Sequence, residues 1–179
     1  MKGGKPYFPS FISGQTRGDP SAVGSVNVEA ADMSLGAVFA SMTSPFITGD
    51  YIKSQFAFSQ YYPGFGFYGT LSTVSTQTMY KVKKASAGSF VFSGEAVSLP
   101  LTVTFTSGWN YVPCPYQVST ALAQAFGSLA LATADTLKSQ MQFTTYYDGF
   151  GWFGQLAGLV PGEGYKMKLA SGGVATMGA

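Results

Sequence analysis

A twenty-residue segment of this chain occurs twice, and this internal repeat constrains the fold more than any other feature. Residues 50–69 read DYIKSQFAFSQYYPGFGFYG, and residues 135–154 read DTLKSQMQFTTYYDGFGWFG. Eleven of the twenty aligned positions are identical, at an offset of 85 residues. The match continues downstream, where Tyr80-Lys81-Val82-Lys83 aligns with Tyr165-Lys166-Met167-Lys168. The chain is therefore predicted to be a tandem duplication of one module.

Each module is expected to begin with a short helix and to continue into strands. Asp32 in the first module, and Ser119 or Thr120 in the second, are candidate helix N-caps. The glycines of Gly64-Phe65-Gly66 and Gly149-Phe150-Gly151 indicate hairpin turns. Apolar residues at helical spacing predict an amphipathic helix of about three turns in each module, through Met33, Leu35, Val38, Phe39 and Met42 and through Leu122, Ala125, Phe126 and Leu129.

These elements predict an α+β fold of two tandem pseudo-symmetric β-sheet units, each with one short amphipathic helix, packed as one compact body. Unit 1 is expected over residues 24–98 and unit 2 over residues 99–179. Residues 99–106 are rich in β-branched side chains and predict a strand, which we expect the first unit to borrow as its outer strand.

Residues 1–23 differ in composition and are predicted to be a flexible N-terminal arm. They are rich in Gly, Pro and Ser, yet they contain Tyr7, Phe8 and Phe11. One interpretation is a loose tail, which is usual for chain termini. The other is an arm whose aromatic side chains dock on a neighbouring subunit. The sequence leaves both open.

Charge is scarce, which argues against several classes of partner. Only 10% of the residues are charged and the net charge is +2, so neither nucleic acid nor an anionic membrane is expected to bind. The sequence has no run of 18 apolar residues, so no membrane-spanning helix is expected. The first six residues lack the apolar stretch of a signal peptide. A surface with so little charge favours association between copies.

The sequence offers little for catalysis, so an enzyme is not expected. It contains no histidine, which removes the commonest general base and most catalytic zinc sites. Cys114 has no neighbouring acid or base in sequence and is expected to be a small, partly buried strand residue. Asp50 and Asp135 recur in both modules and could form a carboxylate pair or a cation site. We favour the alternative, in which each opens a strand and accepts backbone hydrogen bonds.

Two further motifs fail as catalytic signals. Lys53-Ser54 and Lys138-Ser139 are adjacent strand residues, which point to opposite faces, so no Ser–Lys dyad is expected. The glycines from Gly64 match the spacing Gly-x-Gly-x-x-Gly, but alternating strand residues follow them in place of the long helix that a dinucleotide site requires. No catalytic, cofactor or metal site is predicted.

Aromatic residues crowd both hairpin turns and are the candidate functional residues. Such side chains can form the core, anchor an interface, or stack on sugar rings. Because alternate strand residues point to opposite faces, both inward and outward positions are expected. The candidates for self-assembly are Tyr7, Phe8, Phe11, Tyr61, Tyr62, Phe65, Phe67, Tyr146, Tyr147, Phe150 and Trp152.

Several motifs together resemble a repeat family of surface-associated bacterial proteins and algal proteins. They are Ser107-Gly-Trp-Asn-Tyr-Val-Pro113, Asp135-x-x-Lys-Ser-Gln140, Gly151-Trp-Phe-Gly154 and Pro161-Gly-x-Gly-Tyr165-x-x-Lys168. The likeness covers residues 99–170 well. The first unit matches over residues 50–85 but departs at Phe67 and lacks the Pro-Gly turn.

Two such units in one chain of low charge resemble the pyrenoid shell proteins of diatoms. That resemblance implies a non-enzymatic protein that polymerises with itself into a sheet or tube around Rubisco, with Rubisco or other pyrenoid components as further partners. It implies a location at the pyrenoid periphery of the chloroplast. The alternative is an extracellular carbohydrate- or matrix-binding module, which the bacterial likeness and the aromatic turns favour.

Overall fold

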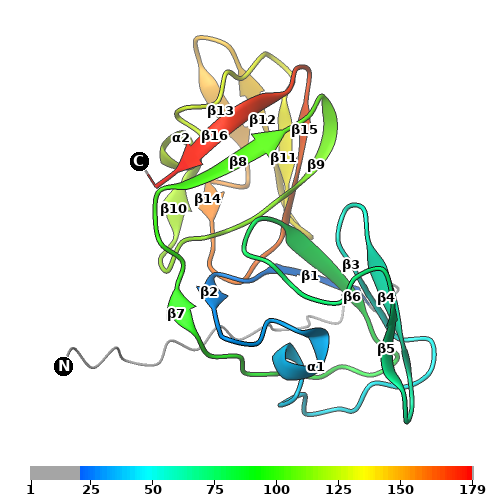
Figure 1. Cartoon of the computed structure of the whole chain (residues 1–179). Coiled ribbons are helices and arrows are strands. Elements are labelled where there is room, and N and C mark those ends of the chain that lie inside the picture. Colours follow the sequence, from blue (N-terminus) through cyan, green and yellow to red (C-terminus); the bar gives the residue numbers. More distant parts are fainter. Residues whose placement is uncertain (1–20, 179) are drawn as a thin grey trace, which may run out of the picture.

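The computed structural model describes residues 21–178, which form a sheet-rich, compact chain (Figure 1). Strands account for 41% of it, and the two helices have four residues each. Residues 21–98 form the first half of the described chain, and residues 99–178 form the second half.

The first half is built on a five-stranded antiparallel sheet. Its order is β1-β6-β3-β4-β5, so β1 and β5 are the edge strands. The strands are β1 (Ser21–Ser25), β3 (Tyr51–Lys53), β4 (Phe58–Tyr62), β5 (Gly66–Gly69) and β6 (Met79–Lys83).

The second half is built on a five-stranded antiparallel sheet of order β13-β12-β11-β15-β9. Its strands are β9 (Gly108–Val112), β11 (Thr136–Lys138), β12 (Phe143–Tyr147), β13 (Gly151–Gly154) and β15 (Tyr165–Leu169). In the first sheet Ile52 pairs with Ser59 and Val82, and in the second Leu137 pairs with Thr144 and Met167. The second set of numbers is 85 higher throughout.

Smaller ladders and two helices complete the fold. β2 (Val28–Glu29) pairs with β7 (Glu95–Ala96), β8 (Leu101–Phe105) with β16 (Gly173–Met177), and β10 (Thr120–Ala121) with β14 (Gly158–Leu159). The helices are α1 (Leu35–Val38) and α2 (Leu122–Ala125).

Each half has its own hydrophobic core, and the two cores differ in character. The first is aromatic, with Phe39, Phe46, Phe90 and Phe92 buried among aliphatic side chains. The second is dominated by leucine and methionine around the fully buried Tyr165. In the first core the rings of Phe39 and Phe46 meet edge to face, with centroids 5.2 Å apart. Such packing adds directional contacts to the burial of apolar area.

Both helices are far shorter than the three turns predicted. Four residues make about one turn. The N-cap of α1 is Ser34, whose Oγ accepts a hydrogen bond from Ala37 N, whereas Asp32 instead accepts one from Ser34 N. The N-cap of α2 is Ala121, without a side-chain hydrogen bond, so Ser119 and Thr120 are not caps. The apolar periodicity beyond the helices is satisfied by loop residues that reach the same core.

A turn joins β3 to β4, and β4 begins only at Phe58. Ser54 N donates to Ala57 O at 2.8 Å, and Ser54 Oγ accepts from Ala57 N at 3.2 Å, which closes a turn between β3 and β4. Phe56 therefore lies on that turn, with 89% of its surface exposed. The hairpins predicted at residues 64–66 and 149–151 are present as β4–β5 and β12–β13.

Two further expectations are corrected, one about where the N-terminal arm ends and one about the partner of the strand at residues 99–106. Residues 21–23 lie in β1, so the boundary of the predicted arm at residue 23 falls too late. The strand predicted at 99–106 exists as β8, but it pairs with β16 at the C-terminal end of the described chain. The edge strands of the first sheet are β1 and β5, and β8 is not borrowed by the first half.

Direct hydrogen bonds join the two halves into one compact body. Gly24 and Glu163 form an isolated antiparallel bridge, and Ser25 N donates to Gly162 O at 3.2 Å. Ser25 Oγ donates to Glu163 O at 2.6 Å. The buried Asn27 donates through Nδ2 to Tyr116 O at 2.8 Å. These bonds lie next to β1, so that strand is both the edge of one sheet and part of the junction.

Candidate functional site

The candidate site is the aromatic hairpin of each half, β4–β5 in the first and β12–β13 in the second. Phe65 N donates to Tyr62 O, and Phe150 N donates to Tyr147 O, each at 3.0 Å. The glycine before each phenylalanine has a positive φ, 82° at Gly64 and 75° at Gly149, which glycine adopts without steric cost. The tight turns leave Phe65 and Phe150 at the hairpin tips, 90% and 81% exposed.

Half of the described candidate residues point into the core. Tyr61 and Phe67 pair across β4 and β5 with ring centroids 5.2 Å apart, and both pack against the aromatic core of the first half. Tyr146 and Trp152 pair in the same way across β12 and β13, at 5.4 Å. Trp152 also packs against Phe126, at 6.2 Å. These four side chains hold each hairpin onto its half.

The other described candidates point outward. Tyr62 and Tyr147 are 39% and 44% exposed, and they lie next to the exposed Phe65 and Phe150. Inward and outward positions alternate along each strand because of the pleat. The remaining candidates Tyr7, Phe8 and Phe11 lie outside the described residues.

Sequence reasoning missed several exposed apolar residues on and beside the same hairpins. They are Phe56, Phe58 and Tyr68 in the first half and Met141, Phe143 and Phe153 in the second. With the candidates above, they make five matched pairs of exposed large side chains, again at an offset of 85. The alternation of strand residues could have identified Phe58, because it lies four residues before the candidate Tyr62 and therefore shares its strand face.

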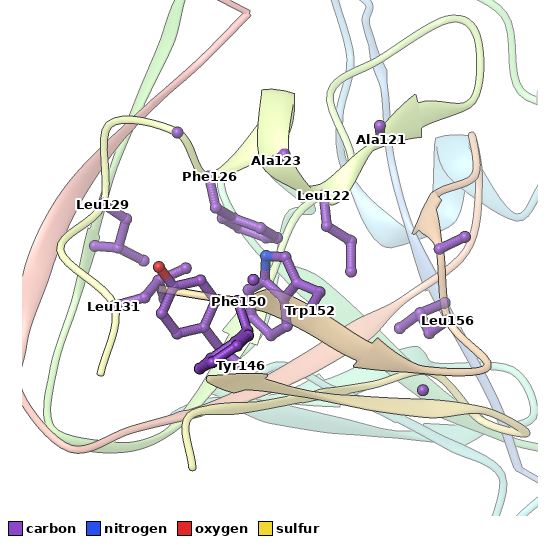
Figure 2. A pocket seen from close by; sticks show the side chains of 14 residues that line it. Ala121, Leu122, Ala123, Phe126, Leu129, Leu131, Tyr146, Phe150, Trp152 and Leu156 are labelled. Atoms are coloured by element: carbon purple, nitrogen blue, oxygen red, sulfur yellow. The ribbon is translucent and has the colours of Figure 1, made fainter. Parts of the chain in front are cut away.

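A groove separates each hairpin from the helix of its half. The groove in the second half has a volume of about 630 Å³, and Figure 2 shows Leu122 and Phe126 on one side with Tyr146, Phe150 and Trp152 on the other. The groove in the first half has about 660 Å³, between Leu35 and Phe39 on one side and Tyr61, Phe65 and Phe67 on the other. Both are lined mainly by apolar side chains.

The repeated carboxylates Asp50 and Asp135 each accept one hydrogen bond from their own loop and one from a residue just after a neighbouring strand. Asp50 accepts from Ile47 N at 3.1 Å and from Ala85 N at 2.8 Å. Asp135 accepts from Ala132 N at 2.9 Å and from Ala170 N at 2.8 Å. Each is 3% exposed and lies immediately before a strand. Both therefore anchor backbone turns, as the favoured interpretation predicts.

The two halves differ at one position beside these carboxylates. Lys84 is buried, and its Nζ lies 3.5 Å from Asp50 Oδ2. The same ammonium donates to the carbonyl oxygens of Ser44 and Pro45 and lies 3.8 Å from the ring centroid of Phe46. In the second half the corresponding residue is the buried Leu169. The sequence did not predict a buried lysine.

The other residues considered for catalysis are occupied by structural roles. Ser139 Oγ accepts hydrogen bonds from Met141 N and Gln142 N, and Ser54 Oγ caps the corresponding turn. Cys114 is fully buried two residues after β9, deeper than expected and not in a strand. Burial raises the pKa of its thiol to about 12, so it is protonated at neutral pH. Within the described part of the chain, no three of His, Cys, Asp and Glu cluster as metal ligands would.

Comparison of the chain with family models, with curated proteins and with solved structures finds no match. Neither helix in residues 21–178 is long and apolar enough to cross a membrane.

Proposed function

We propose that this protein is a structural, non-enzymatic protein that assembles with copies of itself into a sheet or shell. The observation that carries the proposal is the set of five matched pairs of exposed large apolar side chains on the two hairpins. The two hairpins lie at opposite ends of the body (Figure 1). Burying one large apolar side chain contributes roughly 1.5–3 kcal/mol, so several such contacts favour association.

The architecture supports this proposal as a pseudo-symmetric α+β duplication. The strand ladders and the exposed side chains repeat at an offset of 85 residues, and the helix side of the grooves repeats at 87, which supports two similar units in one body. Similar surfaces at two ends allow one copy to contact the next, and a contact that does not close on itself propagates into an array. The hairpin of one unit is proposed to meet that of the other unit, because their exposed faces are unequal, with Phe56 and Tyr68 in the first half where Met141 and Phe153 stand in the second.

The resemblance of the duplicated motifs to diatom pyrenoid shell proteins supports a location for such an array. We propose a shell around the Rubisco-containing pyrenoid of a chloroplast, with Rubisco or other pyrenoid components as further contacts. A fluorescent fusion expressed in a diatom tests this directly. Signal surrounding the Rubisco compartment supports it, and signal elsewhere contradicts it.

Two hairpin variants test the assembly. Phe65→Ser with Tyr68→Ser removes the most exposed side chains of the first hairpin, and Phe150→Ser with Phe153→Ser makes the matching change in the second. Sedimentation and negative-stain microscopy should show ordered assemblies of the wild type and none for either variant. Val118→Ser, at a 70% exposed position on neither hairpin, is the matched control and should assemble.

Mixing the two variants tests which ends meet. If the first hairpin contacts the second, each variant alone is monomeric, and the mixture forms dimers that grow no further. If like ends meet, each variant alone forms dimers through its intact hairpin. A wild type that stays monomeric across protein concentration and salt would sink the assembly proposal.

The alternative is an extracellular module that binds carbohydrate or matrix. Trp109, on the edge strand β9, is 44% exposed and could stack on a sugar ring. A glycan array with the wild type and Trp109→Ala separates the two functions. Binding that is lost in Trp109→Ala, by a protein that forms no ordered assemblies, favours the alternative.

A further inference from the structure

Two pairs of lysines lie directly opposite each other on the sheets. Lys53 pairs with Lys81 across β3 and β6, and Lys138 pairs with Lys166 across β11 and β15. Side chains at directly opposite positions of an antiparallel pair lie on the same face, only about 5 Å apart at Cβ. Like charges in that position destabilise a sheet. The sequence repeat places this unfavourable arrangement in both halves.

The fold then brings the two pairs together at the junction of the halves. A pocket of about 290 Å³ lies there, and Lys81, Lys138 and Lys166 line it with Ser139 and Gln140. Val23 of β1 forms part of its wall. None of the described residues that line it carries a carboxylate. Three lysines from two different sheets therefore line one small space.

Neighbouring aromatic rings support two of these lysines. The Nζ of Lys138 lies 4.4 Å from the ring centroid of Trp109, and that of Lys166 lies 5.1 Å from the ring centroid of Tyr111. Rings at this distance stabilise a cation and restrict its position. The main cause that lowers the pKa of Lys166 is burial, followed by the charges of Lys81, Lys138 and Lys53. The ammonium groups are thus close enough to repel one another.

The pocket walls are held by contacts independent of the lysines. Gln55 bridges to the backbone of β9 through Trp109 O and Tyr111 N, at 2.9 Å and 2.7 Å. The bridge between Gly24 and Glu163 fixes β1 beside the turn before β15. Because the walls do not depend on the lysines, the positive charge is not needed to close the junction.

We propose that this junction pocket binds a multivalent oxyanion, a phosphate or sulfate group. Such a group carries several acceptor oxygens and can accept charge-assisted hydrogen bonds from separate ammonium groups at once. A volume of 290 Å³ equals roughly ten times the share of one water molecule in the liquid, which leaves room for a substituent on the group. Binding would relieve the repulsion between the lysines and stabilise the junction.

Calorimetric titration of the purified chain with inorganic sulfate and with inorganic phosphate tests the site. Chloride at the same ionic strength controls for general screening of charge. Lys138→Gln and Lys166→Gln should each weaken saturable binding by about tenfold or more, as loss of one charge-assisted hydrogen bond predicts. Lys83→Gln and Lys168→Gln, which remove the same charge from residues that do not line the pocket, should bind as the wild type does.

Thermal unfolding provides a second measurement, in which the expected rise in melting temperature differs from the fall that a misfolded variant would show. Without the oxyanion, Lys138→Gln should raise the melting temperature by removing repulsion, whereas sulfate should raise it by more for the wild type than for this variant. Glucose 6-phosphate and a sulfated monosaccharide distinguish the sources. If either sugar binds more tightly than the inorganic ions, the natural ligand is a larger molecule that carries the phosphate or sulfate group. If the sugars and the inorganic ions bind equally, the natural ligand is the free ion. No saturable binding, or equal binding by Lys138→Gln, Lys166→Gln and the wild type, would overturn the proposal.

Discussion

The side chain of Gln55 hydrogen-bonds the backbone of Tyr111, with Tyr111 N donating to Gln55 Oε1 at 2.7 Å. Gln55 Nε2 donates in turn to Trp109 O at 2.9 Å. Gln55 belongs to the first half and β9 is an edge strand of the second sheet. One amide from the first half thus caps the exposed backbone edge of the second. Unpaired strand edges recruit other strands, so this cap also limits which contacts an assembly can use.

Replacing Gln55 by alanine should weaken the junction. The variant loses two hydrogen bonds to backbone groups that water can partly replace, so we expect a loss of about 1 kcal/mol in the free energy of unfolding. Urea unfolding followed by circular dichroism measures it. Gln60→Ala, on β4 of the same sheet, is the control. Equal effects of the two substitutions would argue against the cap.

The two repeated aspartates should differ in their contribution to stability. Asp50→Asn leaves the Lys84 ammonium buried without its counter-charge, which typically costs about 3–5 kcal/mol. Asp135→Asn disturbs only hydrogen bonds to two backbone N–H groups and should cost about 1–3 kcal/mol. Chemical denaturation of both variants gives the comparison.

A second substitution identifies the cause of that difference. Lys84→Leu copies Leu169, its counterpart in the second half, and removes the buried charge. Combined with Asp50→Asn, it should recover part of the lost stability. If the double variant is as unstable as the sum of the two single changes, the ion pair is not the cause.

Cys114 should be unreactive in the folded protein. A pKa raised from 9.0 to about 12 lowers the thiolate fraction at pH 8 by roughly a thousandfold, and burial blocks access as well. Alkylation by iodoacetamide at pH 8 should be negligible without denaturant and complete in urea. Rapid alkylation of the folded chain would contradict the buried placement.

The same thiol should make stability fall at alkaline pH. Its pKa is raised on folding, so its stabilising contribution is present below pH 9 and is lost as the pH rises towards 12. Between pH 8 and pH 10.5 this group accounts for a loss of about 2 kcal/mol. Urea unfolding of Cys114→Ala at both pH values should show a decline smaller by about that amount. A decline equal to that of the wild type would refute the assignment.

Gly154 should not tolerate a side chain. A Cβ there would collide with the carbonyl oxygen of Phe143 and lie 2.6 Å from Thr144 Cα, because β12 and β13 approach closely. Gly154→Ala should therefore cost at least about 2 kcal/mol, read from thermal unfolding. Gly36→Ala, in α1, meets nothing within 4 Å and should be neutral or stabilising by up to about 1 kcal/mol. Similar melting temperatures for the two variants would contradict the close approach.

Local signals in the sequence were sufficient for the hairpins and for the aspartate turns. The glycines around Phe65 and Phe150 have positive φ, and alternation along the strands predicted that both inward and outward aromatic positions occur. Asp50 and Asp135 accept backbone hydrogen bonds from Ile47 N and Ala132 N, three residues earlier in the chain, as their positions before strands predicted. These features depend on residues close in sequence, which is why they could be predicted from it.

Features that depend on distant residues were decided by the tertiary structure. The apolar periodicity from Met33 to Met42 predicted a helix of about three turns, but Phe39 lies beyond the end of α1 and packs in an aromatic core assembled from loops. Lys84 is buried because Asp50 and the carbonyl groups of Ser44 and Pro45 surround its ammonium. The convergence of Lys138 and Lys166 with Lys81 exists only because the two sheets meet.

The sequence by itself therefore determined the repeat, the turns and the alternating faces of the strands. Only the tertiary structure decided which strand lies at each edge and which aromatic side chains remain exposed. The physical reason is that a turn is stabilised by contacts within a few residues. The pairing of β1 with β6, or of β8 with β16, depends on packing between segments about 60–70 residues apart.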